Sequence, residues 1–587
     1  MTRQRRPWLW RSDTLRRCPA TGTRLSNWWL VTVAVTLVGC GDEATETVAG
    51  DGTPAPPSAT SCAEPLQGDV GADWPEVFVG VSSCDDAGSG SREVPFCSFE
   101  SALDAVPNAP GIVTVLAGDY RLMDQLAADS YRLELARPGS PGAYFVLRAD
   151  QGAQPRIWGS IAIEGTEFVA AGANLQRAST ATLRRNPPGM WTAGGLRLEH
   201  HHAPFDAGSG LYHVDVAELS EGEWTMADDG GTACNDVGPD CFVYLWPPAG
   251  MDVATERFEL AQGGFLNVEG SDYLAVQGLT VEFTYWTPIF FTGSAHLLVE
   301  DNRFAHNAAM GGNNAYGLSF WNTQGGVIRR NQVTDTRYWT EANSWGITFM
   351  LAGNEAGGEI WVCDNELSDF LRAAVGSKGG ASQIRVVGNV MVDSTTAVEV
   401  PESRCDGPSC GFRYPTGDWT VRENLIENCG RGFDMGHLGA DDVGFVSPNR
   451  VHNNVMVGAE HGIAVQIGDP HLTVRNNVFI DTVGFRLGGD PSPGAFVNIL
   501  DADYNLFPED IAYEAHQDFQ VQGSWTLAEV QASVSQEAHS LSGDPLLDTG
   551  ARYEPLPGSP VIGAGDPSVY VDPGGPVNMG RYPFVQP

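Results

Sequence analysis

An asparagine returns in the same apolar frame throughout the second half of the chain. It follows a short run of alternating apolar residues, and a second short apolar run comes after it, as in the segments around Asn331, Asn424 and Asn477. The eight positions, spaced by 29, 34, 24, 35, 30, 23 and 28 residues, are Asn302, Asn331, Asn365, Asn389, Asn424, Asn454, Asn477 and Asn505. Periods of about 20 to 50 residues are typical of chains wound into stacked coils. The spacing therefore predicts one coil for each asparagine.

A second repeated element accompanies several of these asparagines. It is a glycine followed by an apolar residue, a variable residue and another apolar residue, and it occurs as Gly317–Phe320, Gly346–Phe349, Gly432–Met435 and Gly462–Val465. Apolar residues at alternate positions are typical of strands with one buried face. Together with the apolar runs on both sides of each asparagine, this element predicts three short strands per coil.

This arrangement resembles the right-handed parallel β-helix of the pectate-lyase-like superfamily, in which stacked asparagines form a ladder along one bend. The resemblance covers roughly residues 76–587 and implies an all-β fold of about ten coils. In such a ladder each side-chain amide bonds its own turn and the amides one coil above and below, and each satisfied bond contributes about 1 kcal/mol. Lyases, hydrolases, epimerases and non-catalytic adhesins share this scaffold, so activity must be argued from individual residues.

The regions outside the main repeats divide the chain further. We expect residues 76–164 to form an N-terminal cap and the first coils, residues 165–255 a β-rich insertion, residues 256–510 the main parallel β-helix, and residues 511–587 a C-terminal cap. Ser98 is a candidate helix N-cap and Pro107 a stop, which predicts a helix over residues 99–106. Thr526 and Glu529 form a capping-box pattern for another short helix. The last region is expected to close the far end of the coil and to contribute no chemistry.

The first 39 residues have the features of an export signal. Seven arginines precede an apolar stretch from Trp28 to Val38, which is too short to span a bilayer, and Leu37–Cys40 has the form of a lipobox. The resemblance implies a bacterial lipoprotein lipidated at Cys40, with a flexible linker up to residue 75. Asp42 lies two residues after Cys40 and not directly after it, so we expect a cell-envelope location at the outer membrane or the cell surface.

The composition is strongly acidic. The chain has 34 Lys and Arg against 73 Asp and Glu, a net charge of −39. Without residues 1–39 the counts are 27 and 72, a net charge of −45. This excess argues against nucleic acid as a partner, and an anionic polysaccharide would need Ca²⁺ or a local basic patch in order to dock. A neutral glycan meets no such barrier.

The chain has 11 cysteines, a number that fits an oxidising, extracytoplasmic compartment. Three pairs lie close together in loop-like sequence and are expected to form disulfides: Cys84 with Cys97, Cys234 with Cys241, and Cys405 with Cys410. None of these pairs has the CxxC spacing or the nearby histidine that a zinc site needs. Cys62, Cys363 and Cys429 have no assigned partner.

Lys378 is the only lysine, beside 33 arginines. Aligning the glycine-containing runs places Ser319, Thr348, Gly376, Glu399 and Asp434 in one outward column and Lys378 in the next column, diagonal to Glu399. Adjacent coils are about 4.8 Å apart, so the carboxylates of Glu399 and Asp434 would stack at roughly that separation. Lys378, Glu399 and Asp434 are therefore the candidate catalytic residues.

Two mechanisms fit these three residues. In lyases of the superfamily that use a lysine, that residue abstracts the proton beside a uronate carboxyl group; for Lys378 this requires a pKa about three units below the usual value, and neighbouring carboxylates oppose such a shift. In a retaining glycosidase, two carboxyl groups about 5 to 5.5 Å apart serve as nucleophile and acid/base without a cation. A surface ion pair between Lys378 and Glu399, worth under about 1 kcal/mol, explains the same residues without catalysis.

A lyase would also need a cation. Glu399, Glu402 and Asp434 are the expected ligands for Ca²⁺, and no other cofactor is expected. The calcium-dependent lyases of the superfamily place acidic ligands a few residues before the lysine, whereas this chain has Leu371, Arg372 and Ala373 there. This departure weakens the lyase hypothesis.

Aromatic residues near the column suggest a glycan groove, since aromatic faces stack on sugar rings. The segment Arg337–Trp345 lengthens one coil beside the column. The residues expected to bind substrate are Trp321, Arg337, Trp339, Trp345 and Arg404. His437 and His461 each stand alone in the sequence, which favours solvated side chains.

These observations favour a surface-anchored, carbohydrate-active protein that acts on extracellular polysaccharide as a lyase or a glycosidase. Its expected partners are a polysaccharide and, through the lipid at Cys40, the membrane; we expect a monomer that binds no nucleic acid. The alternative is a non-catalytic, glycan-binding or adhesive lipoprotein whose coil is a structural support for loops.

Overall fold

The computed structural model describes residues 62, 73–127, 130–172, 174–201, 213–234, 237–309, 314–338, 344–353, 358–400, 417–435, 449–465, 472–488, 500–508, 512–517, 520–534, 536–568 and 577–581. All of them belong to one compact unit, Pro56–Pro587. Cys40, the expected signal over residues 1–39 and the expected Cys405–Cys410 pair lie outside the described residues. Within the described ranges, no helix has both the length and the apolar character needed to cross a membrane.

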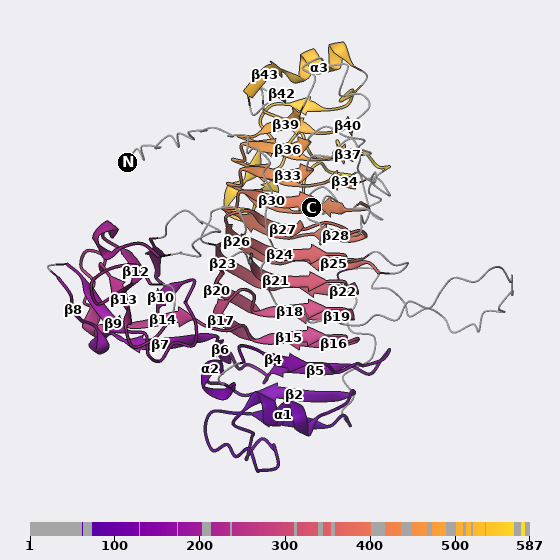
Figure 1. The fold of residues 1–587 in the computed structure, drawn as a ribbon. Helices are drawn as coiled ribbons and strands as arrows, with labels where there is room; N and C mark the ends of the chain where they lie inside the picture. The colour runs from indigo at the N-terminus through magenta and orange to yellow at the C-terminus, as the bar shows by residue number, and fades with distance from the viewer. Residues whose placement is uncertain are drawn as a thin grey trace, which may run out of the picture. The chain divides into compact units, whose positions relative to one another are not determined.

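The coil is formed by three sheets of twelve strands each, whose strands are stacked from one coil to the next (Figure 1). Sheet A consists of β1 (Glu76–Val79), β2 (Gly111–Val115), β5 (Phe145–Ala149), β16 (Leu274–Gln277), β19 (Ala295–Glu300), β22 (Gln324–Arg329), β25 (Ile360–Cys363), β28 (Ile384–Val387), β31 (Thr420–Arg422), β34 (Asn449–His452), β37 (Leu472–Arg475) and β40 (Leu500–Asp503). Sheet B consists of β3 (Asp119–Arg121), β6 (Arg156–Trp158), β17 (Thr280–Tyr285), β20 (Arg303–Ala309), β23 (Gln332–Tyr338), β26 (Glu366–Phe370), β29 (Val390–Val392), β32 (Leu425–Glu427), β35 (Val455–Val457), β38 (Val478–Ile480), β41 (Leu506–Phe507) and β44 (Leu541–Ser542).

Sheet C carries the candidate site. It consists of β4 (Leu133–Leu135), β15 (Leu266–Glu269), β18 (Ile289–Thr292), β21 (Ala315–Trp321), β24 (Ser344–Met350), β27 (Ala373–Ser377), β30 (Thr396–Val400), β33 (Arg431–Met435), β36 (His461–Val465), β39 (Val483–Gly488), β42 (Tyr513–Gln517) and β43 (Gln520–Trp525). Its neighbouring strands pair in parallel, except that β43 is antiparallel to β42. The parallel coils predicted from the asparagine spacing are thus confirmed. In sheet A the first four strands, β1, β2, β5 and β16, carry no ladder asparagine, and each of the other eight leads to one. Each sheet therefore has twelve strands where about ten coils were expected.

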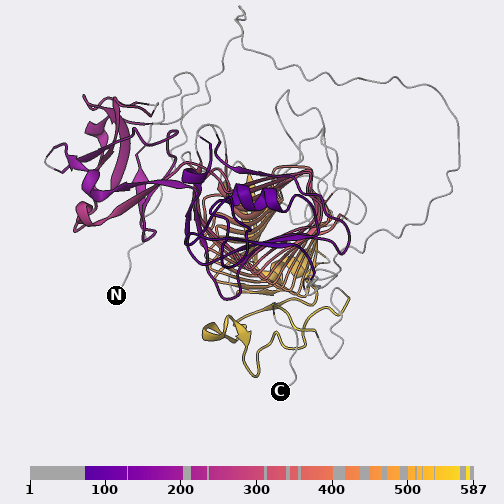
Figure 2. The same cartoon turned by 90° about the horizontal axis from the view of Figure 1, so that it is seen from below.

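Apolar side chains from all three sheets fill the interior of the coil, which Figure 2 shows along its axis. Phe291, Phe320 and Phe349 come from successive strands of sheet C and are at most 1% exposed. Their rings stack at centroid distances of 4.8 and 5.5 Å. Because each coil places the same kind of residue at the same inward position, the core repeats with the strand spacing.

The predicted asparagine ladder is present at the bend between sheets A and B. Each ladder residue from Asn302 to Asn477 donates its backbone N–H and its Nδ2 to Oδ1 of the next asparagine, at 2.9 to 3.1 Å. The residue before each ladder position adopts a left-handed conformation, as at Asp301 with φ 58°. The final member, Asn505, donates instead to the carboxylate of Glu537, which is fully buried.

Both predicted terminal helices are confirmed. α1 (Phe99–Ala105) begins at Ser98, whose hydroxyl accepts the backbone N–H of Ser101. α3 (Leu527–Ser533) begins with a capping box between Thr526 and Glu529. A further short helix, α2 (Leu122–Gln125), precedes β4.

The described residues contain three disulfides. Cys84–Cys97 and Cys234–Cys241 form as predicted. Cys62 and Cys363, which had no assigned partner, form a third bridge across 301 residues. Cys429 is a buried free thiol, and burial raises its pKa to about 12.

The β-rich insertion forms an eight-stranded sheet of its own. In spatial order it contains β7 (Ser160–Glu164), β14 (Arg257–Ala261), β10 (Met190–Thr192), β11 (Arg197–His200), β12 (Glu223–Asp228), β13 (Cys241–Leu245), β9 (Gln176–Ser179) and β8 (Val169–Ala170), with the short 3-10 helices η1 (Gly165–Glu167), η2 (Val216–Glu218) and η3 (Val253–Thr255) between strands. The lobe extends past the expected range 165–255 at both ends, because β7 and β14 pair antiparallel with each other. It contacts sheet B through Asp335, which accepts hydrogen bonds from Trp191 Nε1 at 2.9 Å and Arg197 Nη1 at 2.8 Å.

The C-terminal region does more than close the far end of the coil. Its described residues include η5 (Thr549–Ala551) and the pair β45 (Leu547–Asp548) and β46 (Glu554–Pro555). Val561 and Met579 pack against apolar residues on the outer face of sheet B, namely Leu425, Val455, Val478 and Leu506. Asn453 Nδ2 also donates to the backbone oxygen of Asn578 at 2.9 Å. From Asn424 onward the residue after each ladder asparagine is apolar and faces outward, and the C-terminal segment removes these side chains from water.

Candidate functional site

The candidate site lies on the outer face of sheet C. Strand register makes Ser319, Thr348, Gly376, Glu399 and Asp434 consecutive partners, in the order derived from the glycine-containing runs. The same row continues through Ala464 and Arg486 to Glu514. We call this row the outer column.

Gly432 is the second residue of β33. A Cβ there would lie 2.5 Å from the backbone oxygen of Gly462 and 2.6 Å from Sδ of Met456. The close approach of the next strand therefore requires glycine at this position. Phe433 then points into the core, and Asp434 points to the outer face by strand alternation.

Glu399 forms a bidentate ion pair with Arg372. Arg372 Nε lies 2.7 Å from Oε2, and Nη2 lies 2.7 Å from Oε1. Arg372 precedes β27 in the chain and reaches the neighbouring strand, β30. Two parallel charge-assisted hydrogen bonds hold the carboxylate in one orientation.

Asp434 has different surroundings. It is 6% exposed, one of its oxygens contacts Arg431 Nη1, and Oδ1 has no hydrogen-bond partner among the described residues. Burial is the main cause that raises its pKa above the usual range, and the charge of Glu399 adds to it, while Arg431 opposes the shift. Glu399 and Asp434 are thus neighbours with different surroundings: Arg372 holds Glu399 by two hydrogen bonds, whereas Asp434 is buried and one of its oxygens is unpaired among the described residues.

Lys378 follows β27, and its side chain lies near two aromatic rings. Its Nζ lies 5.4 Å from the ring centroid of Trp345 and 5.7 Å from that of Tyr316. The residue as a whole is exposed, yet its ammonium group is partly removed from water. This desolvation, with the charge of Arg372, lowers the pKa of Lys378 to about 8. Arg372 thus occupies the place beside Glu399 where the sequence pattern predicted Lys378.

The aromatic residues of this face differ in accessibility. Trp345 is fully buried, because Tyr316 stacks on it at 5.6 Å and the Arg372 guanidinium lies 4.5 Å from its ring centroid. It supports the two cations and offers no open face to a sugar. Trp321 is partly exposed and packs edge-on against Phe290 at 5.2 Å. Trp339 lies outside the described residues.

The remaining predicted site residues are not brought to this patch. Arg337 lies on sheet B, where it contacts Asp369 and lies 3.3 Å from Asp335 beneath the inserted lobe. Glu402 and Arg404 lie outside the described residues. The residues that sequence reasoning missed are Arg372 and Arg431, both at the start of a sheet C strand, where the alignment of glycine runs did not assign a direction.

Glu399 and Asp434 offer little to a cation, because each carboxylate is already bound by an arginine. Within the described ranges, the one group of three closely spaced potential metal ligands is His461, Glu514 and His516. His461 is 2% exposed in β36, so it is not the solvated loop residue that the sequence suggested.

Residues 263–492 match the family described as right handed beta helix region, and with the sheet topology this makes the coil a right-handed parallel β-helix. No curated protein matches the chain at a significant level. Similar solved structures include a complex of XylC with xylose, which is 12% identical with a TM-score of 0.44 and covers 81% of this chain and 87% of that one. A glycoside hydrolase is 11% identical with a TM-score of 0.46, covering 79% and 99%, and pectate lyase Pel9A is 11% identical with a TM-score of 0.43, covering 87% and 96%. Likenesses at this level leave the activity to be argued from the chain's own residues.

Proposed function

We propose that this protein is a retaining glycoside hydrolase that acts on an extracellular polysaccharide of low charge, with Glu399 as nucleophile and Asp434 as acid/base. The supporting observation is the pairing of these two carboxyl groups in neighbouring strands, where Arg372 orients Glu399 and burial raises the pKa of Asp434. Neighbouring strands place them about 4.8 Å apart, near the separation of about 5 to 5.5 Å that retaining hydrolases use. The net charge of −39 favours a neutral glycan over a polyuronate.

In this mechanism each residue acts twice. Glu399 attacks the anomeric carbon while Asp434 donates its proton to the leaving oxygen, which gives a glycosyl ester on Glu399 and frees one product. Asp434, now ionised, then takes a proton from water, and the resulting hydroxide displaces Glu399 from the anomeric carbon. Asp434 regains its proton, and the net reaction adds one water across the glycosidic bond.

A second candidate is β-elimination on a uronate, and one observation supports it. Lys378 has a pKa of about 8, so a sizeable share of it is neutral near pH 8 and able to accept a proton. Lys378 would take the proton beside the carboxyl group as the glycosidic oxygen leaves. A Ca²⁺ or Arg372 would have to neutralise that carboxylate, and Arg372 is already bound to Glu399.

The test is a product analysis. The soluble chain that starts after Cys40 is incubated with neutral and uronate polysaccharides, with and without Ca²⁺, and the product masses are measured by mass spectrometry. Hydrolysis gives products heavier by one water and is expected to fall at least about 10³-fold in Glu399→Gln and Asp434→Asn. Unsaturated uronate ends that disappear in Lys378→Ala would establish elimination instead. Glycan binding without turnover would support the adhesive alternative.

The matched control is Glu359→Gln. Glu359 accepts hydrogen bonds from Arg385 Nε at 3.1 Å and Nη2 at 2.8 Å beside sheet A. The substitution therefore removes the same kind of ion pair from another face of the coil. Hydrolysis should be unchanged in this variant. An equal loss in all three variants would show that the substitutions act through the fold.

Membrane attachment is a separate part of the proposal. The lipobox ending at Cys40 supports lipidation, with the outer membrane or cell surface as the expected location. Cys40→Ala should move the protein from the membrane fraction to the soluble fraction. Retention in the membrane fraction would contradict the anchor.

A further inference from the structure

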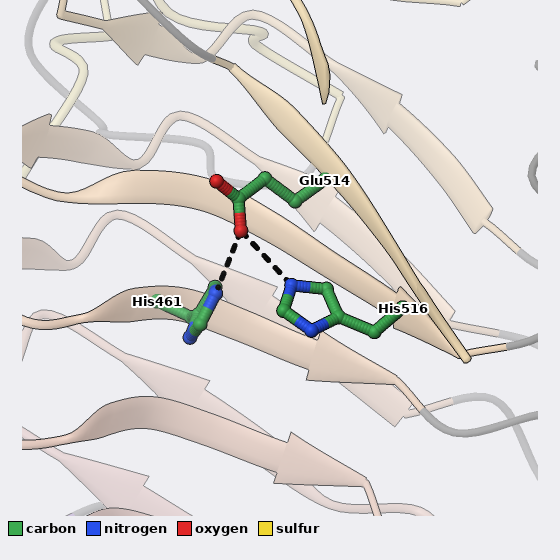
Figure 3. A group of neighbouring side chains, drawn as sticks. All are labelled: His461, Glu514 and His516. Atoms are coloured by element: carbon green, nitrogen blue, oxygen red, sulfur yellow. Dashed lines mark hydrogen bonds and ion pairs between the residues drawn. The ribbon is translucent and has the colours of Figure 1, made fainter. Parts of the chain in front are cut away.

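A second cluster of polar side chains lies on the same outer face, at the far end of sheet C (Figure 3). His461 comes from β36, and Glu514 and His516 come from β42. Glu514 Oε2 lies 3.2 Å from Nε2 of His461 and 2.9 Å from Nε2 of His516. One ligand atom from each residue lies within 4.8 Å of the other two. Three strand steps separate Glu514 from Asp434, roughly 14 Å, so this cluster is distinct from the carboxylate pair.

The local sequence explains why the three side chains meet. Glu514 and His516 are two residues apart on one strand, so they point to the same face. The strand between β36 and β42 is β39, in which Gly488 is the register partner of His516. His461 and His516 lie edge to face at a centroid distance of 5.2 Å.

We infer that His461, Glu514 and His516 form a binding site for a divalent transition metal ion, with Zn²⁺ as the best match. Around a tetrahedral Zn²⁺ with bonds of about 2.0 to 2.1 Å, neighbouring ligand atoms are roughly 3.3 Å apart. The two measured spacings, 3.2 and 2.9 Å, are close to that value. Small side-chain rotations therefore suffice to seat an ion among the two Nε2 atoms and one carboxylate oxygen.

The second nitrogen of each ring supports the same inference. Nδ1 of His461 and Nδ1 of His516 are buried and have no hydrogen-bond partner among the described residues. The His461 side chain is 3% exposed and that of His516 is 10% exposed. When Nε2 binds a metal, the ring keeps its proton on Nδ1, and metal-bound histidines usually donate that proton to a carboxylate or carbonyl group. Glu460 Oε1 lies 4.0 Å from His461 Nδ1, within reach of a small rotation.

The donor set determines the class of ion. Two imidazoles and one carboxylate suit Zn²⁺ and its neighbours in the first transition row, whereas Ca²⁺ requires an all-oxygen site. Glu514 and Glu460 bring negative charge, and Arg486, the register partner of Glu514, brings one opposing positive charge. Three protein ligands leave a fourth position open for water or a substrate atom, as in catalytic zinc sites.

The test is metal binding by the full chain. The purified protein is stripped with a chelator, dialysed, and titrated with Zn²⁺ and with Co²⁺, while bound metal is counted by elemental analysis and Co²⁺ geometry is read from its visible absorption. We expect one ion per chain, a tetrahedral Co²⁺ spectrum without a thiolate band, and no competition from Ca²⁺. Glu514→Gln should weaken binding at least about 100-fold while preserving side-chain shape and hydrogen bonding. His516→Gln should do the same.

The matched control is His539→Gln. His539 Nδ1 lies 2.8 Å from Asp503 Oδ2, so it is a histidine–carboxylate pair without a second histidine. This variant should bind the ion as the wild type does. Stoichiometric binding that survives Glu514→Gln, equal loss in His539→Gln, or no binding to the folded wild type would each overturn the inference. Thermal stabilisation by Zn²⁺ in the wild type, absent in Glu514→Gln, reports the same site independently of activity.

Discussion

Two columns of polar residues run along this coil, and they differ in how fully their polar atoms are paired by hydrogen bonds. In the ladder, an amide oxygen such as Oδ1 of Asn389 accepts two N–H groups from Asn365, at 3.0 and 2.9 Å. In the outer column, Thr348 Oγ1 and Asp434 Oδ1 are buried without a partner among the described residues. Identical residues repeated by translation satisfy one another, whereas unlike residues in neighbouring strands leave polar atoms unpaired among the described residues. The ladder is therefore suited to hold the fold, and the outer column carries the candidate site.

Breaking the ladder should produce the largest loss of stability. Asn389→Ala leaves the backbone N–H of Asn365 and the backbone oxygen of Val362 buried without their partners. Each unsatisfied group costs about 1 to 3 kcal/mol, so the free energy of unfolding should fall by about 5 kcal/mol, measured by denaturant unfolding. The comparison variant is Asn267→Ala, whose side chain bonds Glu134 at the surface and should cost under about 1 kcal/mol. Equal losses of unfolding free energy would show that a ladder asparagine contributes no more than a surface one.

The end of the ladder should give stability an unusual pH dependence. Burial raises the pKa of Glu537 from 4.5 to about 7, although Ser540, Tyr513 and Asn505 donate hydrogen bonds to it. Between pH 4.5 and 7 the folded protein holds this proton while the unfolded chain has lost it. The contribution of Glu537 is therefore full below pH 4.5 and falls by about 3 kcal/mol as the pH rises through 7.

Glu537→Gln tests this linkage, because glutamine does not titrate. Unfolding free energies measured from pH 4.5 to 8 should show a slope in the wild type that is shallower in the variant. The two curves should differ by about 3 kcal/mol across that range. Parallel curves would mean that Glu537 titrates alike in both states.

The sequence predicted those parts of the fold that repeat or depend on near neighbours. The asparagine spacing predicted the coils, and Ser98 and Thr526 predicted the helix starts. The Cys62–Cys363 disulfide joins residues 301 positions apart, so no local pattern indicates it. The return of the C-terminal segment along sheet B was also not predicted, since it depends on which outward apolar residues the folded coil leaves uncovered.

The candidate site shows the same limit. The repeat placed Glu399 beside Asp434, because register follows from aligned glycines. It did not reveal Arg372, which lies outside the aligned run and reaches Glu399 through a long side chain. The His461 cluster was missed because its members are separated by more than 50 residues, although a Glu-x-His pair on one strand was visible in the sequence.

Removing the arginine beside Glu399 should leave the Glu399 carboxylate without the ion pair that distinguishes it from an ordinary surface carboxylate. In Arg372→Met, Glu399 keeps Asp434 as a neighbour and loses its bidentate cation. Its carboxylate loses the two hydrogen bonds that orient it, so kcat should fall by about 10²-fold while KM changes little. The control Arg385→Met breaks the comparable pair with Glu359 and should leave kcat unchanged. An equal loss of kcat in both variants would contradict this positioning role.

The smallest expected effect tests the comparison most directly, because it uses one residue type in two settings. Thr482 Oγ1 accepts the backbone N–H of Ala459 at 3.1 Å and donates to the backbone oxygen of Ile480 at 2.8 Å, whereas Thr348 Oγ1 has no partner among the described residues. Both residues are at most 3% exposed. Thr482→Val should therefore destabilise the protein by about 1 to 2 kcal/mol, while Thr348→Val should be neutral or stabilise it by up to about 1 kcal/mol.

Denaturant unfolding of both variants measures that difference, and glycan binding gives it meaning. If the Thr348 hydroxyl bonds a ligand, Thr348→Val should weaken glycan affinity and leave stability intact. Thr482→Val should lower stability and leave glycan affinity intact. Equal destabilisation by the two substitutions would show that the outer column satisfies its hydroxyl groups as fully as the ladder satisfies its amides. The contrast between the two columns would then be one of residue type alone and would no longer mark the outer face of sheet C as a binding surface.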